Sequence, residues 1–362
     1  MNSSNIGGQA VLEGIMMKNR ETYSVAVRKP DGEIEVDIQE YKGVLPWKAP
    51  QKIPFIRGIF NFVDSLVLGM KTLTYSASFF EDEEEEILTE DEARKQEKKE
   101  KLIMNLTVVV SVLIAVGIFM VLPYYLSSII EKHTSSHLVM TVLEGVIRVA
   151  IFLIYIVLIS RTKDIKRTFM YHGAEHKSIN CVENGKELTV ENVRMQTTVH
   201  KRCGTSFLLI VMFVSILFFM FIVVGNVWLR MVLRILLIPV IAGLSYEFIR
   251  YAGEHDNKVI NVLSKPGLML QSLTTKEPDD SMIAVAIAAV EAVFDWKAFL
   301  EEEKTENEEE PVEEVKEKVE DEIEILSIDD EDDEEEDEIL NALDRYFEAP
   351  EPSDEEKKES DT

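Results

Sequence analysis

Four long apolar runs constrain the fold of this chain more than any other feature. The first, Ile103–Leu126, contains 24 residues and no charge. At about 1.5 Å per residue, a helix of that length crosses roughly 30 Å of hydrocarbon. Such runs exclude a purely soluble fold and predict a mainly α protein built around a four-helix polytopic membrane bundle. The other predicted spans are Leu138–Ser160, Thr205–Leu229 and Met231–Ile249.

The basic residues in the loops predict the orientation of these spans. Residues 161–204 carry nine Lys and Arg residues, whereas Ser127–His137 carries one. Because positively charged loops stay on the cytoplasmic side, we expect both termini and the loop 161–204 to be cytoplasmic. Cys181 and Cys203 would then lie in a reducing compartment and remain free thiols.

Two elements are predicted ahead of the first span. Apolar and polar residues alternate over Tyr23–Val27 and Ile34–Ile38, and the turn-forming Lys29-Pro30-Asp31-Gly32 joins them, which predicts a β-hairpin. Apolar residues then recur with a helical period over Ile53–Phe80, which predicts an amphipathic helix. Its apolar face is expected either to lie in the membrane interface or to pack on the bundle.

Shorter signals follow the second span. Thr189 is expected to cap a short helix, and Asp279 to cap an Ala-rich helix that runs to about Phe299. Lys265-Pro266-Gly267 is expected to interrupt the chain between the fourth span and that last helix.

The acidic charge is concentrated at the C-terminal end. Of a formal net charge of −28, residues 301–362 supply 32 acids and 6 bases. This segment has too little apolar surface to offset the entropy of ordering the chain, so we expect it to be disordered. It could recruit a basic protein partner, while a chain this acidic is not expected to bind nucleic acid. The expected organisation is an N-terminal segment, an amphipathic helix with a charged linker, a membrane domain and an acidic tail, over residues 1–50, 51–102, 103–299 and 300–362.

The main chemical signal is the sequence His172-Gly173-Ala174-Glu175-His176. On a helix the two histidines lie one turn apart on one face, as two ligands of one metal ion require. The same H-x-x-E-H pattern occurs in one class of zinc peptidases, where the histidines bind zinc and the glutamate activates water. His200 and Cys203 form a second pair, and the predicted topology brings both pairs to the cytoplasmic mouth of the bundle.

The two pairs predict a site for zinc or another divalent transition metal. Four protein ligands would close the coordination sphere and make the site structural. Three ligands, with Glu175 as base, would make a hydrolase-type site. The candidate ligands are His172, His176, His200 and Cys203.

Other uses of these residues also stay open. Lys201 and Arg202 flank Cys203 and would lower its pKa, and His200 could then act as base for a nucleophilic thiol. Glu254-His255-Asp256 offers further metal ligands after the fourth span. Alternatively, the His and Cys side chains only bind backbone groups and lipid headgroups.

Glu144 and Arg148 form a separate feature, because they lie inside the second span on one helical face. Each charge costs roughly 2.5–3.5 kcal/mol near the bilayer centre on insertion scales. We therefore predict that the two side chains pair, either at a polar cavity or as a contact that holds helices together.

Several stretches together resemble the bacterial DUF1385 family, an integral-membrane family of undefined function. They are GGQAVLEGIMMKN, VAVRKPDGEI, YHGAEHKSINCVENGKELTVENVR, HKRCGTSFLL and KPGLMLQSLTTKEPDD. The resemblance extends from about Asn5 to Phe299 and implies a multi-pass protein of the bacterial cell (inner) membrane. It also implies the label often given to the family, predicted metal-dependent enzyme, which rests on the same His and Cys residues. The family usually has Pro where this chain has Lys201, so the turn before Cys203 is less rigid here.

Two classes of function follow. The first is a membrane-embedded metal-dependent enzyme of the hydrolase type that acts on a lipid-linked or membrane-proximal substrate. The alternative is a non-enzymatic scaffold or chaperone of membrane-protein biogenesis, consistent with the amphipathic segment and the acidic tail. A transporter is a distant third, because four spans show no visible inverted repeat.

Overall fold

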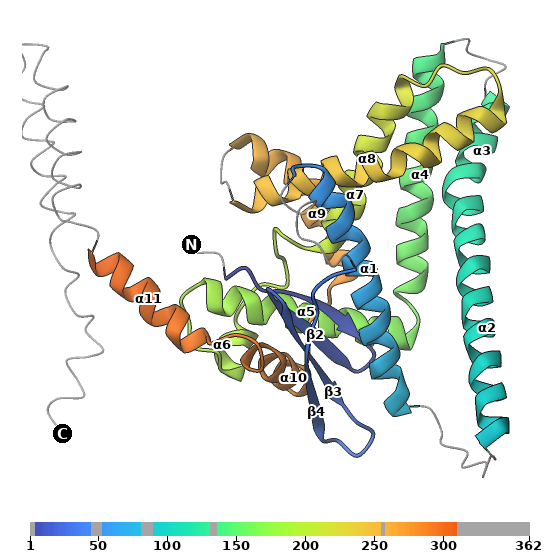
Figure 1. Cartoon of the computed structure of the whole chain (residues 1–362). Helices are drawn as coiled ribbons and strands as arrows, with labels where there is room; N and C mark the ends of the chain where they lie inside the picture. The colour runs from blue at the N-terminus through green and yellow to red at the C-terminus, as the bar shows by residue number, and fades with distance from the viewer. Residues whose placement is uncertain (1–3, 45–52, 81–89, 131–135, 255–257, 310–362) are drawn as a thin grey trace, which may run out of the picture. The chain divides into compact units, whose positions relative to one another are not determined.

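A computed structural model describes five stretches of the chain (Figure 1). The chain divides into one unit of residues 1–303 and a second of residues 304–362. In the described stretches the first unit is mainly helical, with an antiparallel sheet near the N-terminus. The predicted disordered tail falls almost wholly outside them. The described stretches are residues 4–44, 53–80, 90–130, 136–254 and 258–309.

The sheet has four strands in the order β1-β2-β3-β4, each antiparallel to the next. The predicted hairpin is confirmed as β3 and β4, joined by a turn in which Gly32 takes a φ of 89°. The sequence did not predict β1 and β2, because β2 is buried on both faces and therefore shows no alternation. The strands are β1 Gly7–Val11, β2 Gly14–Asn19, β3 Thr22–Arg28 and β4 Ile34–Glu40.

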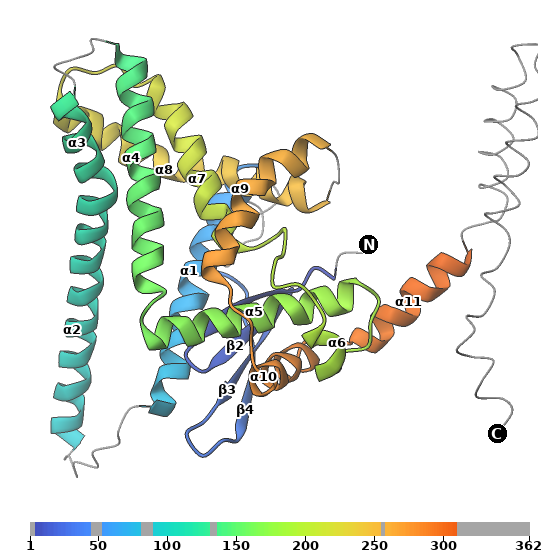
Figure 2. The same ribbon diagram turned by 180° about the vertical axis from the view of Figure 1, so that it is seen from behind.

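Helices cover both faces of this sheet (Figure 2). On one face, Ile15, Met17 and Ala26 pack in a core with α5 (Lys163–Glu183) and α10 (Asp280–Glu291). On the other face, Leu68 of α1 (Ile56–Ala77) packs against apolar residues of β1, β2 and β3. The sheet is therefore the middle layer of three, and its two cover layers come from distant parts of the sequence.

Three of the four predicted spans are long and apolar enough to cross a membrane: residues Leu102–Ile130, Leu138–Ile159 and Trp228–Gly253. The predicted span Thr205–Leu229 is wrong in length, because its helix α7 is only Gly204–Met220. The chain leaves α7 after Met220, and Asn226 Oδ1 accepts from Leu229 N at 3.1 Å, so the next helix begins earlier than predicted. The helices are α2 Glu90–Val116, η3 Gly117–Val121, α3 Leu122–Ile130, α4 His137–Ile159 and α8 Val227–Glu254.

The remaining elements test the shorter sequence signals. Thr189 caps α6 by accepting from Asn192 N, and Asp279 caps α10 by accepting from Met282 N, as predicted. The predicted interruption at Pro266 is wrong, because Pro266 lies inside α9, where the neighbouring glycine packs closely on α7. The predicted helix to Phe299 is instead two helices. The further bounds are η2 Ser78–Phe80, α6 Val190–Arg194, α9 Lys258–Thr274 and α11 Trp296–Glu309.

Helix α1 buries a stripe of small and polar residues together with Leu68, and it exposes much of its apolar side. Asp64 Oδ1 accepts from Val44 N at 2.6 Å, and Ser76 Oγ accepts from Leu12 N at 3.1 Å, so the polar stripe makes part of the protein contacts. The helix also packs on the bundle: the ring centroid of Phe62 lies 5.5 Å from that of Phe207 on α7, and a Cβ on Gly243 of α8 would lie 3.4 Å from Cγ1 of Ile59. Of the two expectations, packing on the bundle is therefore observed for part of the helix. The large exposed apolar residues of the helix are Ile56, Val63, Leu66, Val67, Met70 and Leu73.

The predicted pair inside α4 is confirmed: Arg148 Nη2 donates to Glu144 Oε1 at 2.8 Å. The pair has a third member that the sequence did not indicate. Arg234 of α8 makes two hydrogen bonds to the same carboxylate, at 2.6 and 2.9 Å. These three buried charges connect two of the membrane-capable helices.

Candidate metal centre

Three of the predicted ligands converge. His172 and His176 lie one turn apart on α5, and Cys203 is the N-cap residue of α7. One potential ligand atom from each side chain lies within 4.8 Å of the others. The ring centroids of the two histidines are 4.4 Å apart. The helical spacing predicted from the H-x-x-E-H stretch is therefore what places the first two side chains on one face.

Backbone carbonyls fix the orientation of both imidazole rings. Nδ1 of His172 lies 2.9 Å from the carbonyl oxygen of Thr274, and Nδ1 of His176 lies 2.6 Å from that of Thr198. A proton on each Nδ1 leaves each Nε2 with a free lone pair. Nε2 of His172 is 3.3 Å from Sγ of Cys203. This is the outer-shell arrangement that metal-binding histidines commonly have.

The cluster is well shielded from water. His176 is 1% exposed and Cys203 is 5% exposed. Burial lowers the pKa of His176, because the charged imidazolium loses its hydration, and the hydrogen bond with Cys203 offsets this in part. A neutral imidazole is the form that binds a metal ion. Two imidazole nitrogens and one cysteine sulfur fit zinc or another soft divalent metal.

Glu175 lies next to the cluster with one oxygen unsatisfied. Its Oε2 is 4.0 Å from Nε2 of His172 and has no hydrogen-bond partner among the described residues. The backbone N–H of Gly8 donates to its carboxylate. Burial raises the pKa of Glu175, because water no longer stabilises the charged form. A carboxyl group with a raised pKa holds its proton to a higher pH than an ordinary glutamate does.

Two glycines let the surrounding backbone approach α5. A Cβ on Gly173 would lie 2.0 Å from the carbonyl oxygen of Lys276, and a Cβ on Gly8 would lie 2.8 Å from Cγ of Glu175. Larger side chains at these positions would force the segment after α9 and strand β1 away from the helix. The glycines of the HGAEH and GGQ motifs thus have a packing role beside the cluster.

The structure does not bring His200 into this cluster. Its Nε2 lies 3.3 Å from Oε2 of Glu183, although its ring centroid is only 5.7 Å from that of His176. The backbone of His200 is held by Gln271, which accepts from its N–H at 2.9 Å and donates to its carbonyl at 2.8 Å. His200 therefore anchors the loop that carries Cys203.

Glu183 is the centre of a second, partly buried network. It accepts hydrogen bonds from Ser4 N at 2.9 Å and Ser4 Oγ at 2.7 Å, and it pairs with Arg202. Burial by itself would raise the pKa of Glu183, but hydrogen bonds from His200 and Ser4 and the charge of Arg202 together lower it to about 2. The network ties the N-terminal segment to α5 and to the loop before α7.

This network predicts an acid-dependent loss of stability. A carboxyl group with an ordinary pKa of 4.5 and a folded pKa of about 2 stabilises the fold above pH 4.5 and loses that effect as the pH falls toward 2. We expect the wild type to lose about 3 kcal/mol more than Glu183→Gln between pH 5 and pH 2. Unfolding of the detergent-solubilised protein as a function of pH measures this difference. If the free energy of unfolding depended on pH equally in the two proteins, the proposed role of this network would be contradicted.

The predicted activation of the Cys203 thiol does not match the geometry. Arg202 pairs with Glu183, and Nζ of Lys201 lies 3.4 Å from Oδ1 of Asn261. The thiol instead lies 3.3 Å from Nε2 of His172 and 3.1 Å from the hydroxyl of Thr205, and it also hydrogen-bonds with His176. The suggested further ligands His255 and Asp256 lie outside the described residues, as does the side chain of Glu254.

Sequence reasoning missed the residues that support the site from other elements. They are Thr205, Thr274, the carbonyl of Thr198 and the side chain of Gln271. Nothing in their residue types marks them as metal-supporting groups. The only available signal was that the stretches containing Thr205, Gln271 and Thr274 belong to the motifs that carry the family resemblance.

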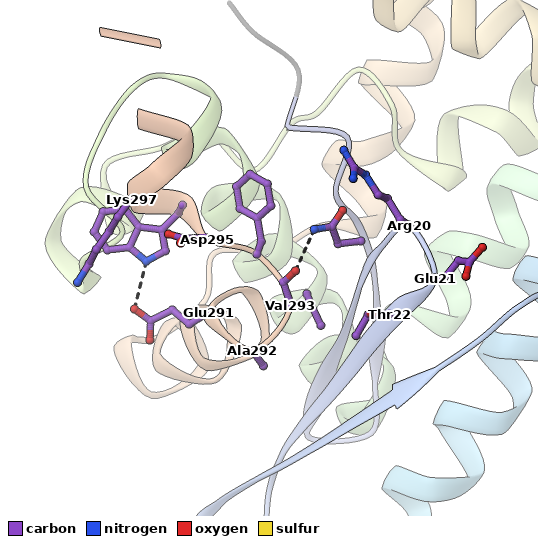
Figure 3. A pocket seen from close by; sticks show the side chains of 11 residues that line it. Arg20, Glu21, Thr22, Glu291, Ala292, Val293, Asp295 and Lys297 are labelled. Carbon is purple, nitrogen blue, oxygen red and sulfur yellow. Dashed lines mark hydrogen bonds between the residues drawn. The ribbon is translucent and has the colours of Figure 1, made fainter. Parts of the chain in front are cut away.

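A surface pocket of about 810 Å³ lies between the β2–β3 turn and the turn after α10 (Figure 3). Three of its polar side chains form hydrogen bonds within the protein. Asn19 Nδ2 donates to the carbonyl of Val293 at 2.9 Å, and Trp296 Nε1 donates to Glu291 at 3.2 Å. The residues that line it include no His or Cys, so the pocket is separate from the candidate metal centre.

Comparisons with known proteins agree with the resemblance drawn from the motifs. The profile of a family described as "Protein of unknown function (DUF1385)" matches residues 53–296. The chain is 34% identical over 299 residues to "Uncharacterized protein YqhQ" of Bacillus subtilis (strain 168). That alignment covers 82% of this chain and 94% of the relative. No solved structure matches the chain.

Proposed function

The chain belongs to the DUF1385 family, and on that premise we propose that it is a bacterial membrane protein that binds one zinc-like ion. The proposed ligands are His172, His176 and Cys203. The observation that supports this most is the convergence of two Nε2 atoms and one thiol, with both Nδ1 atoms already engaged by carbonyls. Such an arrangement aims two lone pairs and a sulfur at one point.

We propose that the candidate metal centre carries out hydrolase-type chemistry. Three protein ligands leave a fourth coordination position open, as in catalytic rather than structural zinc sites. An ion held there would supply Lewis-acid chemistry toward water or a substrate oxygen. Glu175 lies beside the cluster with a free oxygen, so it would take a proton from the attacking water and later return it. In this proposal His200 binds Glu183 and leaves the fourth position open.

The proposed substrate is lipid-linked or membrane-proximal. Helix α1 exposes its apolar side chains, and its Arg57 Nε donates to Glu247 of the membrane-capable helix α8 at 2.7 Å. We propose that this face lies against lipid at the inner membrane, with both chain termini and the metal centre on the cytoplasmic side. The site would then be next to the bilayer surface.

Metal analysis of the purified protein tests the proposal. We expect about one zinc-like ion per chain in the wild type and nearly none in Cys203→Ala. The matched control is Cys181→Ala, because Cys181 is also buried and free but is not part of the cluster. An ion that survives in Cys203→Ala, or that is lost equally in Cys181→Ala, would contradict the assignment.

One observation favours the second function, a non-enzymatic scaffold in membrane-protein biogenesis. The cluster and Glu175 are largely buried, as expected for a metal that only holds α5 and α7 together. Glu175→Gln separates the two functions, because it keeps the metal in both cases. It abolishes turnover only if the carboxylate handles a proton.

A further inference from the structure

The second cluster of buried charges carries an inference that does not depend on the metal site. Glu144, Arg148 and Arg234 are 4%, 7% and 2% exposed and lie within apolar helices. Glu144 accepts from Arg148 at 2.8 Å and from Arg234 at 2.6 and 2.9 Å. Two guanidinium groups thus share one carboxylate.

Groups on the neighbouring elements η3 and α7 accept hydrogen bonds from Arg148. Its Nη1 donates to Ser215 Oγ at 3.2 Å, and its Nε donates to the carbonyl oxygen of Phe119 at 3.0 Å. Phe119 lies in the π-helical turn η3, and turns of this kind are frequent at functional sites. The guanidinium carbons of Arg148 and Arg234 lie 5.1 and 4.8 Å from the centroid of the Phe219 ring.

The cluster is left with an excess positive charge. Glu144 is the only acid in the sequence stretches 102–130, 136–160 and 204–246, which contain three arginines. Nε of Arg234 is buried and has no hydrogen-bond partner among the described residues. An uncompensated charge in an apolar medium is costly, so a further anion would stabilise the site.

A third arginine, Arg230, lies on the side from which an anion would reach the cluster. Arg230 lies one turn before Arg234 on α8, closer to the end of the helix. It is only half-buried, and its guanidinium carbon lies 5.6 Å from the centroid of the Tyr124 ring. Arg234 itself lies six residues into the apolar stretch Trp228–Gly253, roughly 9 Å along the helix. That depth is just below the level of phospholipid headgroups.

We propose that this cluster binds a phosphoryl anion, supplied by the headgroup of an anionic lipid or by free phosphate. Arginine recognises phosphate through paired N–H groups, and one or two charges on the anion would balance the excess. The site lies near the end of α7 opposite Cys203, since Ser215 is twelve residues away, roughly 18 Å along the helix. It is therefore a separate site from the metal centre.

Thermal unfolding in a phosphate-free maltoside detergent tests the proposal. One arm adds phosphatidylglycerol, a second adds sodium phosphate, and sodium chloride is the reference. We expect a phosphate-bearing additive to stabilise the wild type, and Arg234→Met to bind it about tenfold more weakly or worse, the value of one charge-assisted hydrogen bond. Lys186→Met removes a charge from the exposed turn after α5 and should behave like the wild type.

Stabilisation by the lipid alone identifies a headgroup as the source, and stabilisation by phosphate alone identifies a soluble anion. If Arg234→Met does not fold, Arg230→Met serves instead, and native mass spectrometry counts the phospholipid that remains bound. If neither phosphatidylglycerol nor sodium phosphate stabilises the wild type more than sodium chloride does, the proposal is overturned. Equal binding by the wild type and the arginine variants also overturns it.

Discussion

Glu144→Ala is expected to be the most damaging single substitution in the membrane-capable helices. It would leave Arg148 and Arg234 as unpaired charges in an apolar environment. Removing one side of a buried ion network costs about 3–5 kcal/mol, because the remaining charge keeps its desolvation penalty. The measurements are the yield of folded protein in detergent and the free energy of unfolding.

Because Arg148 and Arg234 share the carboxylate of Glu144, substitutions in this network are expected to lower stability by unequal amounts. Arg148→Ala leaves Glu144 bonded to Arg234 through two hydrogen bonds, so it should cost clearly less than Glu144→Ala. Ser215→Ala removes only one neutral partner of Arg148 and should cost about 1 kcal/mol. If Arg148→Ala were as damaging as Glu144→Ala, the carboxylate would not be the shared centre of the network.

Zinc is expected to stabilise the wild type strongly. A ligand that binds only the folded state stabilises it by about 2.7 kcal/mol at a free concentration one hundred times its Kd. His172→Ala should remove this effect, because it takes away one of the three converging ligands. Glu175→Gln should retain it, because its carboxylate is beside the cluster and is not one of the three. Thermal unfolding with and without added zinc measures the difference.

Two outcomes would contradict a metal centre at this position. One is the absence of any zinc-dependent shift in the wild type after full removal of metal. The other is an undiminished shift in His172→Ala, which would place the ion elsewhere. A His176→Gln variant gives a second test if His172→Ala is too unstable to purify, since His176 is the more deeply buried of the two rings.

Local signals in the sequence were sufficient for elements that are defined by short-range chemistry. The Lys29–Gly32 turn, the Thr189 cap and the Asp279 cap each depend on a side chain or glycine within three residues. The pairing of Glu144 with Arg148 likewise follows from helical spacing. In each case the deciding interaction is close in sequence, so one short stretch contains all the information.

Features that depend on distant partners were not predictable in the same way. Strand β2 shows no alternation, because α10, about 260 residues later, covers its second face. The pattern of α1 gave its helical period, but not which side would meet protein. No local sequence pattern indicated that Arg234 would share the carboxylate of Glu144, which is ninety residues away.

The candidate metal centre contains features of both kinds, some that follow from local sequence and some that depend on distant partners. The helical spacing of His172 and His176 was readable from the sequence, and the membrane topology placed Cys203 near them. The side-chain direction of His200 was not readable, because it depends on Glu183 on another element and on Gln271 of α9. A ligand set is a property of the tertiary structure, whereas a ligand pair on one helix is a property of the sequence.

The three-layer arrangement around the sheet also fixes an order of events during synthesis. Strands β2 and β3 leave the ribosome early, but α10 follows only after roughly 260 further residues, an interval of about 13–50 s at 5–20 residues per second. During that interval Ile15, Met17 and Ala26 lack part of their cover. The cover over this face of the sheet is therefore completed only after the three membrane-capable helices of the described residues have been translated. A nascent chain that stalls in those helices still lacks α10 over one face of the sheet, so apolar side chains stay exposed to chaperones and proteases.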